Sequence, residues 1–276
     1  PLNSLLILSQ TLHENKDGNL TEHQQESASI IHNGGVELLN LINDILDLSK
    51  VESGKMTLCI ETVETRKIAE NLENNFEPLA RNKEFRFSVD VAENIPKTFL
   101  TDKQRTIQIL KNLLSNAFKF TQQGAVTLTV AKPALDTRFK QAHLNPQNCI
   151  GFSVEDTGLG IESESQRMIF EAFQQADGST SRDFGGTGLG LTISRELCRL
   201  LGSELQIYSV SQQGSTFTLY MPIENDGLHG DREKSAASVI SFVDSVKPTA
   251  REHPLSFQRV SPHAHQSVNL TEYTAP

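Results

Sequence analysis

Two glycine-rich stretches hold the residues of this chain that are best suited to chemistry. Residues 156–160 read Asp-Thr-Gly-Leu-Gly directly after an apolar run, and residues 185–190 read Gly-Gly-Thr-Gly-Leu-Gly. A carboxylate at the end of a strand can accept a hydrogen bond from an exocyclic amine, and glycines beside it let the backbone approach a flat ring. Backbone amides at the start of a helix bind anions. The ordinary alternative is that both stretches are turns, with Asp156 acting as a local cap.

A third set of polar residues lies upstream, on a helix predicted over residues 102–120 with Asp102 as its cap. Asn112, Asn116 and Lys119 are spaced four and three residues apart, so they share one face of this helix. Amide oxygens can ligate Mg²⁺, and an ammonium group can meet a phosphate. A solvated polar face is the commoner explanation of such a trio. In combination with the two glycine-rich stretches, however, the trio indicates a nucleotide pocket.

The segment before the second glycine-rich stretch has the composition of a mobile lid, since residues 174–187 are polar and rich in glycine. Arg182 is the one basic residue in it, and it could reach a phosphate or remain a solvated charge. The order of the glycines in residues 185–190 fits neither a Walker loop nor the dinucleotide-binding fingerprint, because no Gly-Lys-Ser/Thr follows and no βαβ unit surrounds it.

The overall charge narrows the function classes. The chain has 25 basic and 34 acidic residues and a net charge of −9, which argues against a nucleic-acid surface and requires any phosphate site to be a local arrangement. Its three cysteines are widely spaced and fit neither a disulfide framework nor a zinc site, so we expect a reducing compartment. No apolar run approaches the roughly 20 residues of a membrane span. The chain begins without Met, so a membrane segment upstream stays open.

The first 55 residues predict a helical hairpin. Helices are expected over residues 1–12 and 21–53, on either side of a polar turn, with Gly54 as the C-cap. The longer helix has an apolar stripe with spacings of three and four, made of Leu38, Leu41, Ile45 and Leu48. A hairpin cannot bury so wide a face alone, which predicts a four-helix bundle formed by two chains. The alternative is that the hairpin packs on the next domain.

The following residues mix strands and helices. We expect strands over residues 56–62, 85–91, 125–131, 149–155, 204–210 and 215–222, and helices over residues 63–81, 102–120, 164–173 and 188–201. This order predicts an α/β sandwich with helices on one face of a sheet. Residues 224–276 are rich in Ser, His and Pro with little periodicity, so they are predicted to be a disordered linker or tail.

The motifs NLLSNAFKFT, EDTGLGI, IFEAFQQAD, GGTGLGL and GSTF resemble, in this order, the N, G1, F, G2 and G3 boxes of sensor histidine kinases. These kinases share a superfamily, called GHKL, with Hsp90, DNA gyrase and MutL. The opening PLNSLL and the hairpin through SKVESGKM are similar to the dimerisation and histidine-phosphotransfer domain of the same kinases. The resemblance implies an α+β chain with a dimeric hairpin in residues 1–55, a Bergerat-type ATP-binding sandwich with a mixed sheet in residues 56–223, and a tail in residues 224–276.

The resemblance also implies roles for single residues, with ATP and Mg²⁺ as cofactors. Asn116 would ligate Mg²⁺ with the help of Asn112, and Lys119 would meet a phosphate. Asp156 would accept the adenine amine, with Thr216 beside it. The remaining implied residues are Gly158 and Gly160, which shape the turn; Phe170 and Phe173, which anchor the lid or serve as core aromatics; Arg182; and the amides of Gly186, Thr187, Gly188, Leu189 and Gly190, which face the triphosphate.

One position bears on the type of reaction. Superfamily members that hydrolyse ATP carry a Glu four residues before the metal-binding Asn, where it activates water, and this chain has Asn112 there. An amide cannot accept that proton. Phosphoryl transfer to a histidine, and then to an aspartate of a response-regulator receiver, is therefore favoured. The alternatives are an ATP-hydrolysing conformational machine and a non-catalytic ATP-binding scaffold.

The phospho-acceptor histidine of the family has no counterpart among the residues that carry the resemblance. In the family it lies in an H-E-x-x-x-P segment that precedes the proline matched by Pro1, so we expect this fragment to lack it. His13 and His32 lack that context and are predicted to be surface histidines. The implied partners are a second copy, through the hairpin, and a receiver domain, which the tail would tether in a hybrid kinase. We expect the chain to be the cytoplasmic portion of a sensor, whether or not that sensor is membrane-anchored.

Overall fold

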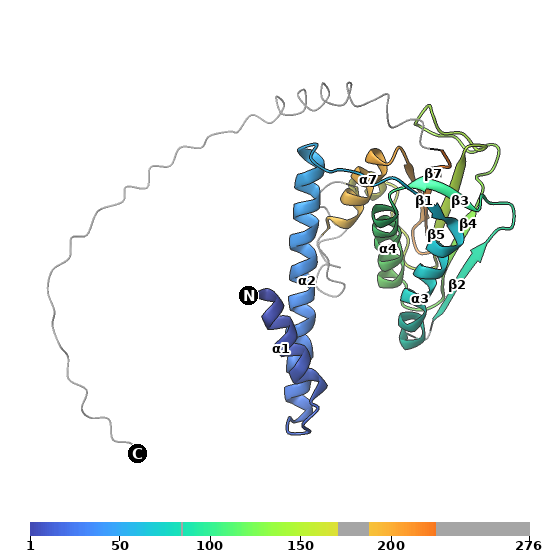
Figure 1. The fold of residues 1–276 in the computed structure, drawn as a ribbon. Coiled ribbons are helices and arrows are strands. Elements are labelled where there is room, and N and C mark those ends of the chain that lie inside the picture. The colour runs from blue at the N-terminus through green and yellow to red at the C-terminus, as the bar shows by residue number, and fades with distance from the viewer. Residues whose placement is uncertain (84, 171–187, 225–276) are drawn as a thin grey trace, which may run out of the picture. The chain divides into compact units, whose positions relative to one another are not determined.

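The computed structural model describes residues 1–83, 85–170 and 188–224 (Figure 1). It begins with the predicted hairpin, formed by α1 (Leu2–Glu14) and α2 (Glu22–Glu52). Thr21 starts α2 with a capping box: its Oγ1 accepts the backbone N–H of Gln24 at 3.3 Å, and its own N–H donates to Oε1 of Gln24 at 2.9 Å. The helix ends at Ser53, and Gly54 follows with φ at +64°, the left-handed conformation that glycine adopts freely.

His32 lies on the face of α2 that packs against α1. Its Nδ1 is 3.2 Å from the carbonyl oxygen of Leu6 and 3.4 Å from Oγ of Ser9, and the side chain is half-buried. The prediction of a surface histidine is therefore wrong for His32, since this face of α2 covers α1. His13 is exposed, as expected.

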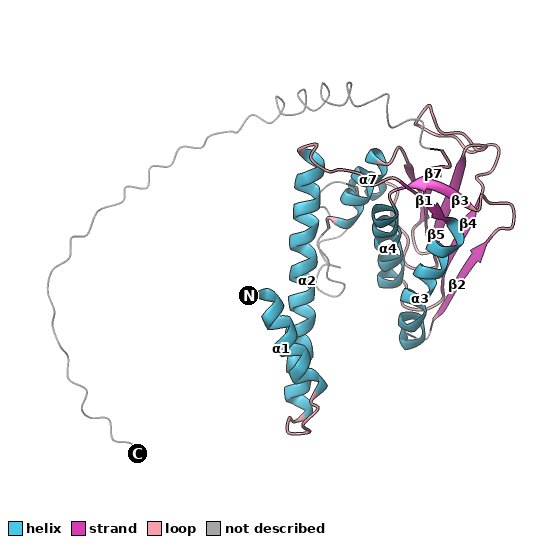
Figure 2. Cartoon of the chain, viewed as in Figure 1, coloured by secondary structure: helices cyan, strands magenta, loops and turns pink. Residues whose placement is uncertain are grey.

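A five-stranded mixed sheet forms the body of the rest of the chain (Figure 2). Its strands, in spatial order, are β2 (Arg86–Val91), β4 (Ala125–Ala131), β5 (Cys149–Asp156), β7 (Gly214–Pro222) and β6 (Glu204–Val210). The β2–β4 pair is parallel and the other pairs are antiparallel. Two short strands, β1 (Glu61–Glu64) and β3 (Thr98–Thr101), pair with each other.

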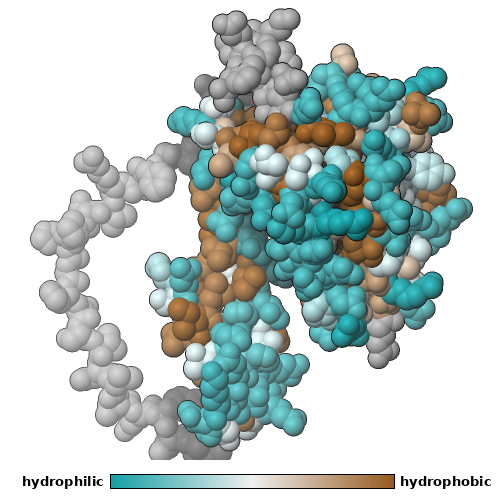
Figure 3. Space-filling model, turned by 45° about the vertical axis from the view of Figure 1, so that its right-hand side comes forward, coloured by the Kyte–Doolittle hydropathy of each residue, from teal (hydrophilic) through white to brown (hydrophobic). Residues whose placement is uncertain are grey.

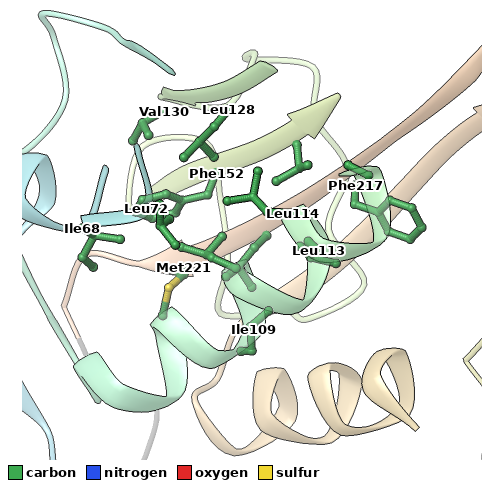
Figure 4. Close-up of a cluster of buried hydrophobic side chains, with 14 of the residues drawn as sticks. Ile68, Leu72, Ile109, Leu113, Leu114, Leu128, Val130, Phe152, Phe217 and Met221 are labelled. Atoms are coloured by element: carbon green, nitrogen blue, oxygen red, sulfur yellow. The ribbon is translucent and has the colours of Figure 1, made fainter. Parts of the chain in front are cut away.

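Three helices cover one face of this sheet: α3 (Thr65–Lys83), α4 (Lys103–Phe120) and α7 (Gly190–Leu200). A short helix, α5 (Ser165–Met168), follows β5. Figure 4 shows apolar side chains from α3, α4 and three strands meeting between the layers: Ile68, Leu72, Ile109, Leu113, Leu114, Leu128, Val130, Phe152, Phe217 and Met221. The predicted fold class, a hairpin followed by an α+β sandwich with a mixed sheet and helices on one face, is confirmed.

Some predicted elements differ from the structure. Residues 56–60 form no strand, and the strand that follows spans only residues 61–64. Its partner β3 was not predicted, because four residues that abut the cap of α4 are too short to show an alternating pattern. The predicted helix over residues 164–173 is described only as α5, since residues 171–187 lie outside the described part. The predicted disorder of the tail also falls outside it, apart from residue 224.

The hairpin contacts the sandwich through the C-terminal half of α2. Val51 is buried in the same apolar cluster as the sandwich core, and Leu41 and Leu48 pack against that cluster. By contrast, Leu38 and Ile45 remain 48% and 43% exposed. Half of the predicted stripe therefore packs on the sandwich, which was the alternative interpretation, and half is left uncovered within the described residues.

Across the described residues, no helix is both long enough and apolar enough to cross a membrane.

Candidate functional site

Asp156 is the last residue of β5 and is buried, with 7% of its surface exposed. Its Oδ1 accepts the backbone N–H of Gly158 at 2.8 Å. Burial raises the pKa of this carboxyl group, while backbone hydrogen bonds from Gly158 and Ser215 oppose the rise. A carboxylate kept in a desolvated position without a countercharge costs stability. Such groups are candidates for ligand binding.

The first glycine-rich turn lies between α4 and the β6–β7 hairpin. A Cβ at Gly158 would clash with the carbonyl oxygen of Phe120, the last residue of α4. Gly160 has φ at +64°, and a Cβ there would clash with the carbonyl oxygen of Val210, the last residue of β6. Both glycines are therefore required by close backbone approach, in agreement with their predicted role in shaping the turn.

The structure corrects the placement of Thr216. In the antiparallel register of β5 and β7, Asp156 lies opposite Ser215, and Thr216 lies opposite Glu155. Side chains alternate along a strand, so Thr216 is on the other face of the sheet from Asp156. The expectation that Thr216 accompanies Asp156 is wrong, and Ser215, which is buried, takes that place. Counting back by two from the core residue Phe217 would have identified Ser215.

Helix α4 presents the predicted polar stripe. Asp102 caps the helix as expected, since its Oδ1 accepts the backbone N–H of Arg105 at 3.0 Å. Asn112 donates from Nδ2 to Oγ of Ser194 on α7 at 2.9 Å, and Asn116 lies one turn further along the same face. Both asparagines are partly exposed, so a ligand could contact them.

Lys119 completes the stripe near the end of α4. Burial lowers the pKa of its ammonium group, and the acidic side chain of Glu37 on α2 opposes this shift. Its Nζ lies 4.8 Å from the ring centroid of Phe120. A half-buried cation of this kind gains most from an anion placed beside it, because the anion favours the charged form.

The described end of the second glycine-rich stretch, residues 188–190, lies against α4 at Asn112. Gly188 has φ at +67°, Leu189 is fully buried, and Gly190 begins α7. A Cβ at Gly190 would clash with Oδ1 of Asn112. Glycine is therefore needed at position 190 for α7 to start against the side chain of Asn112, and the start of a helix can bind an anion.

Phe170 is the last described residue before residues 171–187. Its side chain packs against the core, and its carbonyl oxygen accepts a hydrogen bond from Oγ1 of Thr192 on α7 at 3.1 Å. The core interpretation of Phe170 is thus confirmed, and its role as a lid anchor stays a prediction. The other predicted site residues of this segment lie outside the described residues: Phe173, Arg182, Gly186 and Thr187.

Helix α4 brings the described parts of the site together. The first glycine-rich turn touches it at Phe120 and the second touches it at Asn112, eight residues earlier, which is a rise of about 12 Å. Asn116 and Lys119 lie between these two levels. The arrangement offers a hydrogen-bond acceptor at one end, an anion site at the other, and two amides and a cation along the wall.

Among the described residues, amide oxygens are the candidate metal ligands of this site. The described residues contain no group of three or more His, Cys, Asp or Glu that could hold one. The amide oxygens of Asn112 and Asn116, together with oxygens of a bound phosphate, are ligands of the kind that Mg²⁺ accepts. The residues present therefore fit Mg²⁺ bound jointly with a nucleotide.

Comparison with known proteins bears on these observations. Residues 101–225 match the family model "Histidine kinase-, DNA gyrase B-, and HSP90-like ATPase", and residues 1–54 match "His Kinase A (phospho-acceptor) domain". The circadian input-output histidine kinase CikA of Synechococcus elongatus is 41% identical over 224 residues, covering 80% of this chain and 28% of the relative. The chain belongs to the sensor histidine kinases. Hybrid signal transduction histidine kinase K of Dictyostelium discoideum is 37% identical over 225 residues, covering 81% of this chain and 18% of that protein.

These histidine kinase relatives are much longer than the chain. The autoinducer 2 sensor kinase/phosphatase LuxQ of Vibrio parahaemolyticus is 34% identical over 248 residues, covering 90% of this chain and 27% of the relative. The chain thus spans less than a third of the length of these three curated relatives.

Solved structures of histidine kinases share the fold. The crystal structure of full-length ShkA in complex with AMPPNP superposes with a TM-score of 0.63 at 30% sequence identity, covering 80% of this chain and 43% of that one. The histidine kinase AdeS of Acinetobacter baumannii gives a TM-score of 0.53 at 20% identity, covering 80% and 96%, which shows the fold alone. The predicted family, the sensor histidine kinases, and the predicted fold class are confirmed.

Proposed function

We propose that this chain binds ATP together with Mg²⁺ and forms the catalytic part of a protein that phosphorylates a histidine. The observation that carries the proposal is the convergence of both glycine-rich stretches on α4, with the buried carboxyl group of Asp156 at one end and the start of α7 at the other. The ShkA structure, which contains AMPPNP, supports a nucleotide at such a site.

Each described residue has a defined task in the proposal. Asp156 accepts the exocyclic amine of adenine, and the backbone held open by Gly158 admits the ring. Asn116, helped by Asn112, holds the metal, and Lys119 meets a phosphate. The amides at the start of α7, from Gly188 to Gly190, receive the remaining phosphate charge.

The reaction we propose is transfer of the γ-phosphoryl group to a histidine nitrogen and then to an aspartate of a response-regulator receiver. A neutral imidazole already presents a lone pair, so it needs little activation as a nucleophile. Bound Mg²⁺ would neutralise charge on the transferring phosphoryl group. Since Asn112 is an amide and its Nδ2 donates to Ser194, its side chain does not act as a base toward water.

This proposal is tested on the full-length parent protein with ATP labelled at the γ-phosphate. We expect label on the protein that is stable to alkali and labile to acid, as a phosphohistidine is, and that passes to a purified receiver. Steady release of ADP without protein-bound label would instead support the ATP-hydrolysing machine. ATP binding without protein-bound label and without release of ADP would support the non-catalytic ATP-binding scaffold.

We also propose that the hairpin joins two copies of the chain, and that they work in the cytoplasm, where ATP and receiver domains are available. Figure 3 shows hydrophobic surface along the hairpin. The large apolar side chains that remain exposed on α1 and α2 include Leu5, Ile7, Leu8, Leu12, Ile30, Ile31, Leu38, Ile42, Ile45 and Leu46. A second hairpin would cover these side chains in a four-helix bundle.

A further inference from the structure

Ser194 has no role in the site as described so far, although it is the residue to which Asn112 is bonded. It lies in the second turn of α7 and is 1% exposed. Its Oγ accepts the hydrogen bond from Nδ2 of Asn112 at 2.9 Å. A polar atom buried this deeply needs a partner, so the contact is a fixed part of the packing between α4 and α7 rather than a chance approach of two surface groups.

The two ends of the Asn112 amide are not equivalent. Nδ2 can only donate hydrogen bonds, and Oδ1 can only accept them or ligate a cation. In the structure Nδ2 is the end that faces α7 and donates to Ser194, so Oδ1 is the end left to accept a hydrogen bond or to ligate a cation.

Gly190 completes the slot that holds this amide. It lies one turn before Ser194 on α7, and the Oδ1 atom of Asn112 is the nearest atom to the position that a Cβ at residue 190 would take. Gly190 thus makes room for the amide by lacking a side chain, and Ser194 accepts the hydrogen bond from its N–H. The result is that Oδ1 is directed to the start of α7, where the phosphates are proposed to bind.

We propose that Ser194 is a positioning residue for metal-dependent nucleotide binding, because it fixes the Asn112 amide with its oxygen toward the phosphate end of the site. The inference rests on the proposed function, since it specifies how the metal ligand is oriented. Without the serine hydroxyl, the amide can rotate and present its N–H₂ group to the cation. Loss of a residue that orients a metal ligand typically lowers metal affinity by about 10- to 100-fold.

The test is calorimetric titration of the chain with ATP, once with Mg²⁺ and once with a chelator. For Ser194→Ala we expect the affinity for Mg²⁺-ATP to fall by about tenfold or more. The affinity for metal-free ATP should change by less than about twofold, since the adenine and backbone contacts persist. Ser194→Thr, which keeps a hydroxyl group, should restore the metal dependence. Cys198→Ala is the matched control, because it removes one buried heavy atom a turn further along α7 and should leave the metal dependence unchanged.

A double substitution separates positioning from simple destabilisation. If Ser194 acts through Asn112, then Ser194→Ala should add nothing to the loss caused by Asn112→Ala. Additive losses, or equal losses with and without Mg²⁺, would overturn the inference, and so would an unchanged metal dependence in Ser194→Ala.

The same measurements distinguish a failure of the proposed function from a failure of this inference. If the wild-type chain shows no affinity for Mg²⁺-ATP, the proposed function and the inference both fall. If the wild-type chain binds and Asn116→Ala removes the metal dependence while Ser194→Ala does not, only the inference falls.

Discussion

At the scale of single residues, the buried carboxyl group of Asp156 reduces stability and is also the group proposed to bind adenine. Its carboxyl group is buried at the end of a strand, where burial raises its pKa. A folded-state pKa above the unfolded value means that ionising this group at neutral pH reduces stability, and the reduction disappears as the pH falls through the raised pKa. The proposed contact with adenine is stronger with the ionised group, so stability and binding depend on pH in opposite directions.

The variant Asp156→Asn should separate these two effects. We expect the nucleotide-free variant to unfold at the same temperature as the wild type or higher, because no charge is buried. It should lose the thermal shift that ATP gives the wild type, because its amide presents a donor to the adenine amine. Differential scanning fluorimetry with and without ATP measures both, and a retained ATP shift would refute the role of Asp156.

The pH dependence provides a second measurement on the same residue. As the pH is lowered through the raised pKa of Asp156, ATP affinity should fall while the unliganded protein gains stability relative to Asp156→Asn. Titration calorimetry measures the affinity and urea unfolding measures the stability, both from neutral pH downward. Affinity and stability changing in the same direction would contradict the account.

Residue-scale prediction from the sequence succeeded where a motif has fixed spacing and failed where contacts join distant segments. The spacing of Asn112, Asn116 and Lys119 placed them on one face of α4, and the Asp and Gly residues of the first turn lie as expected. The residue beside Asp156 was predicted to be Thr216 and is Ser215, because the pairing of β5 with β7 sets which side chains share a face. Ser194 could not be found, since it contacts Asn112 across 82 residues of sequence.

At the scale of elements, α4 is the wall of the site and is tied to the hairpin. Arg105 donates from Nη1 to Oδ2 of Asp47 at 3.0 Å, and Gln108 donates from Nε2 to the same oxygen at 2.9 Å. Arg105, Gln108 and Asn112 fall on one face of α4, at spacings of three and four residues. The contact from α2 therefore reaches the face that carries the proposed metal ligands.

Removing this contact should destabilise the chain. The Asp47 and Arg105 side chains are only 16% and 18% exposed, so Asp47→Ala leaves two donors without their acceptor. We expect a loss of about 1–3 kcal/mol in the free energy of unfolding, as for other hydrogen bonds to charged groups. Urea unfolding followed by circular dichroism measures it.

A matched control is available in the exposed ion pair of Lys67 and Glu64, whose side chains are 62% and 55% exposed. Lys67→Ala should leave the unfolding midpoint unchanged, because exposed pairs are screened by solvent. If Asp47→Ala also leaves the unfolding midpoint unchanged, the hydrogen bonds between α2 and α4 do not stabilise the chain.

Elements with long periodic patterns were predicted within a few residues, whereas short ones were not. The hairpin, α3, α4, α7 and the five strands of the main sheet all lie near their predicted ranges, because burial of one face imposes a clear period on the sequence. The β1–β3 pair was missed, since it has only four residues in each strand.

At the scale of the whole molecule, the exposed apolar side chains of the hairpin predict self-association. Ile30 is 66% exposed on α2, and the described part of the chain offers nothing that covers it. Sedimentation equilibrium should show a dimer, and Ile30→Glu should weaken that dimer by placing a charge in its interface. Leu135 is 86% exposed in the loop after β4, so Leu135→Glu is a control that should leave the association unchanged. A monomeric wild-type chain, or equal effects of both substitutions, would contradict this interface.

The family and the broad architecture were accessible from the sequence because five motifs occur in a fixed order, which no single motif would have established. The division of the hairpin's apolar face between the sandwich and a second copy was not accessible, because the periodicity shows which side chains need burial but not what buries them.

The most direct measurement is a crystal structure of this chain with Mg²⁺ and a non-hydrolysable ATP analogue. The account predicts the exocyclic amine of adenine within hydrogen-bonding distance of the Asp156 carboxylate, the metal bound through the amide oxygen of Asn116, and the phosphates at the start of α7. An analogue bound away from α4, or an adenine ring that does not contact Asp156, would contradict it.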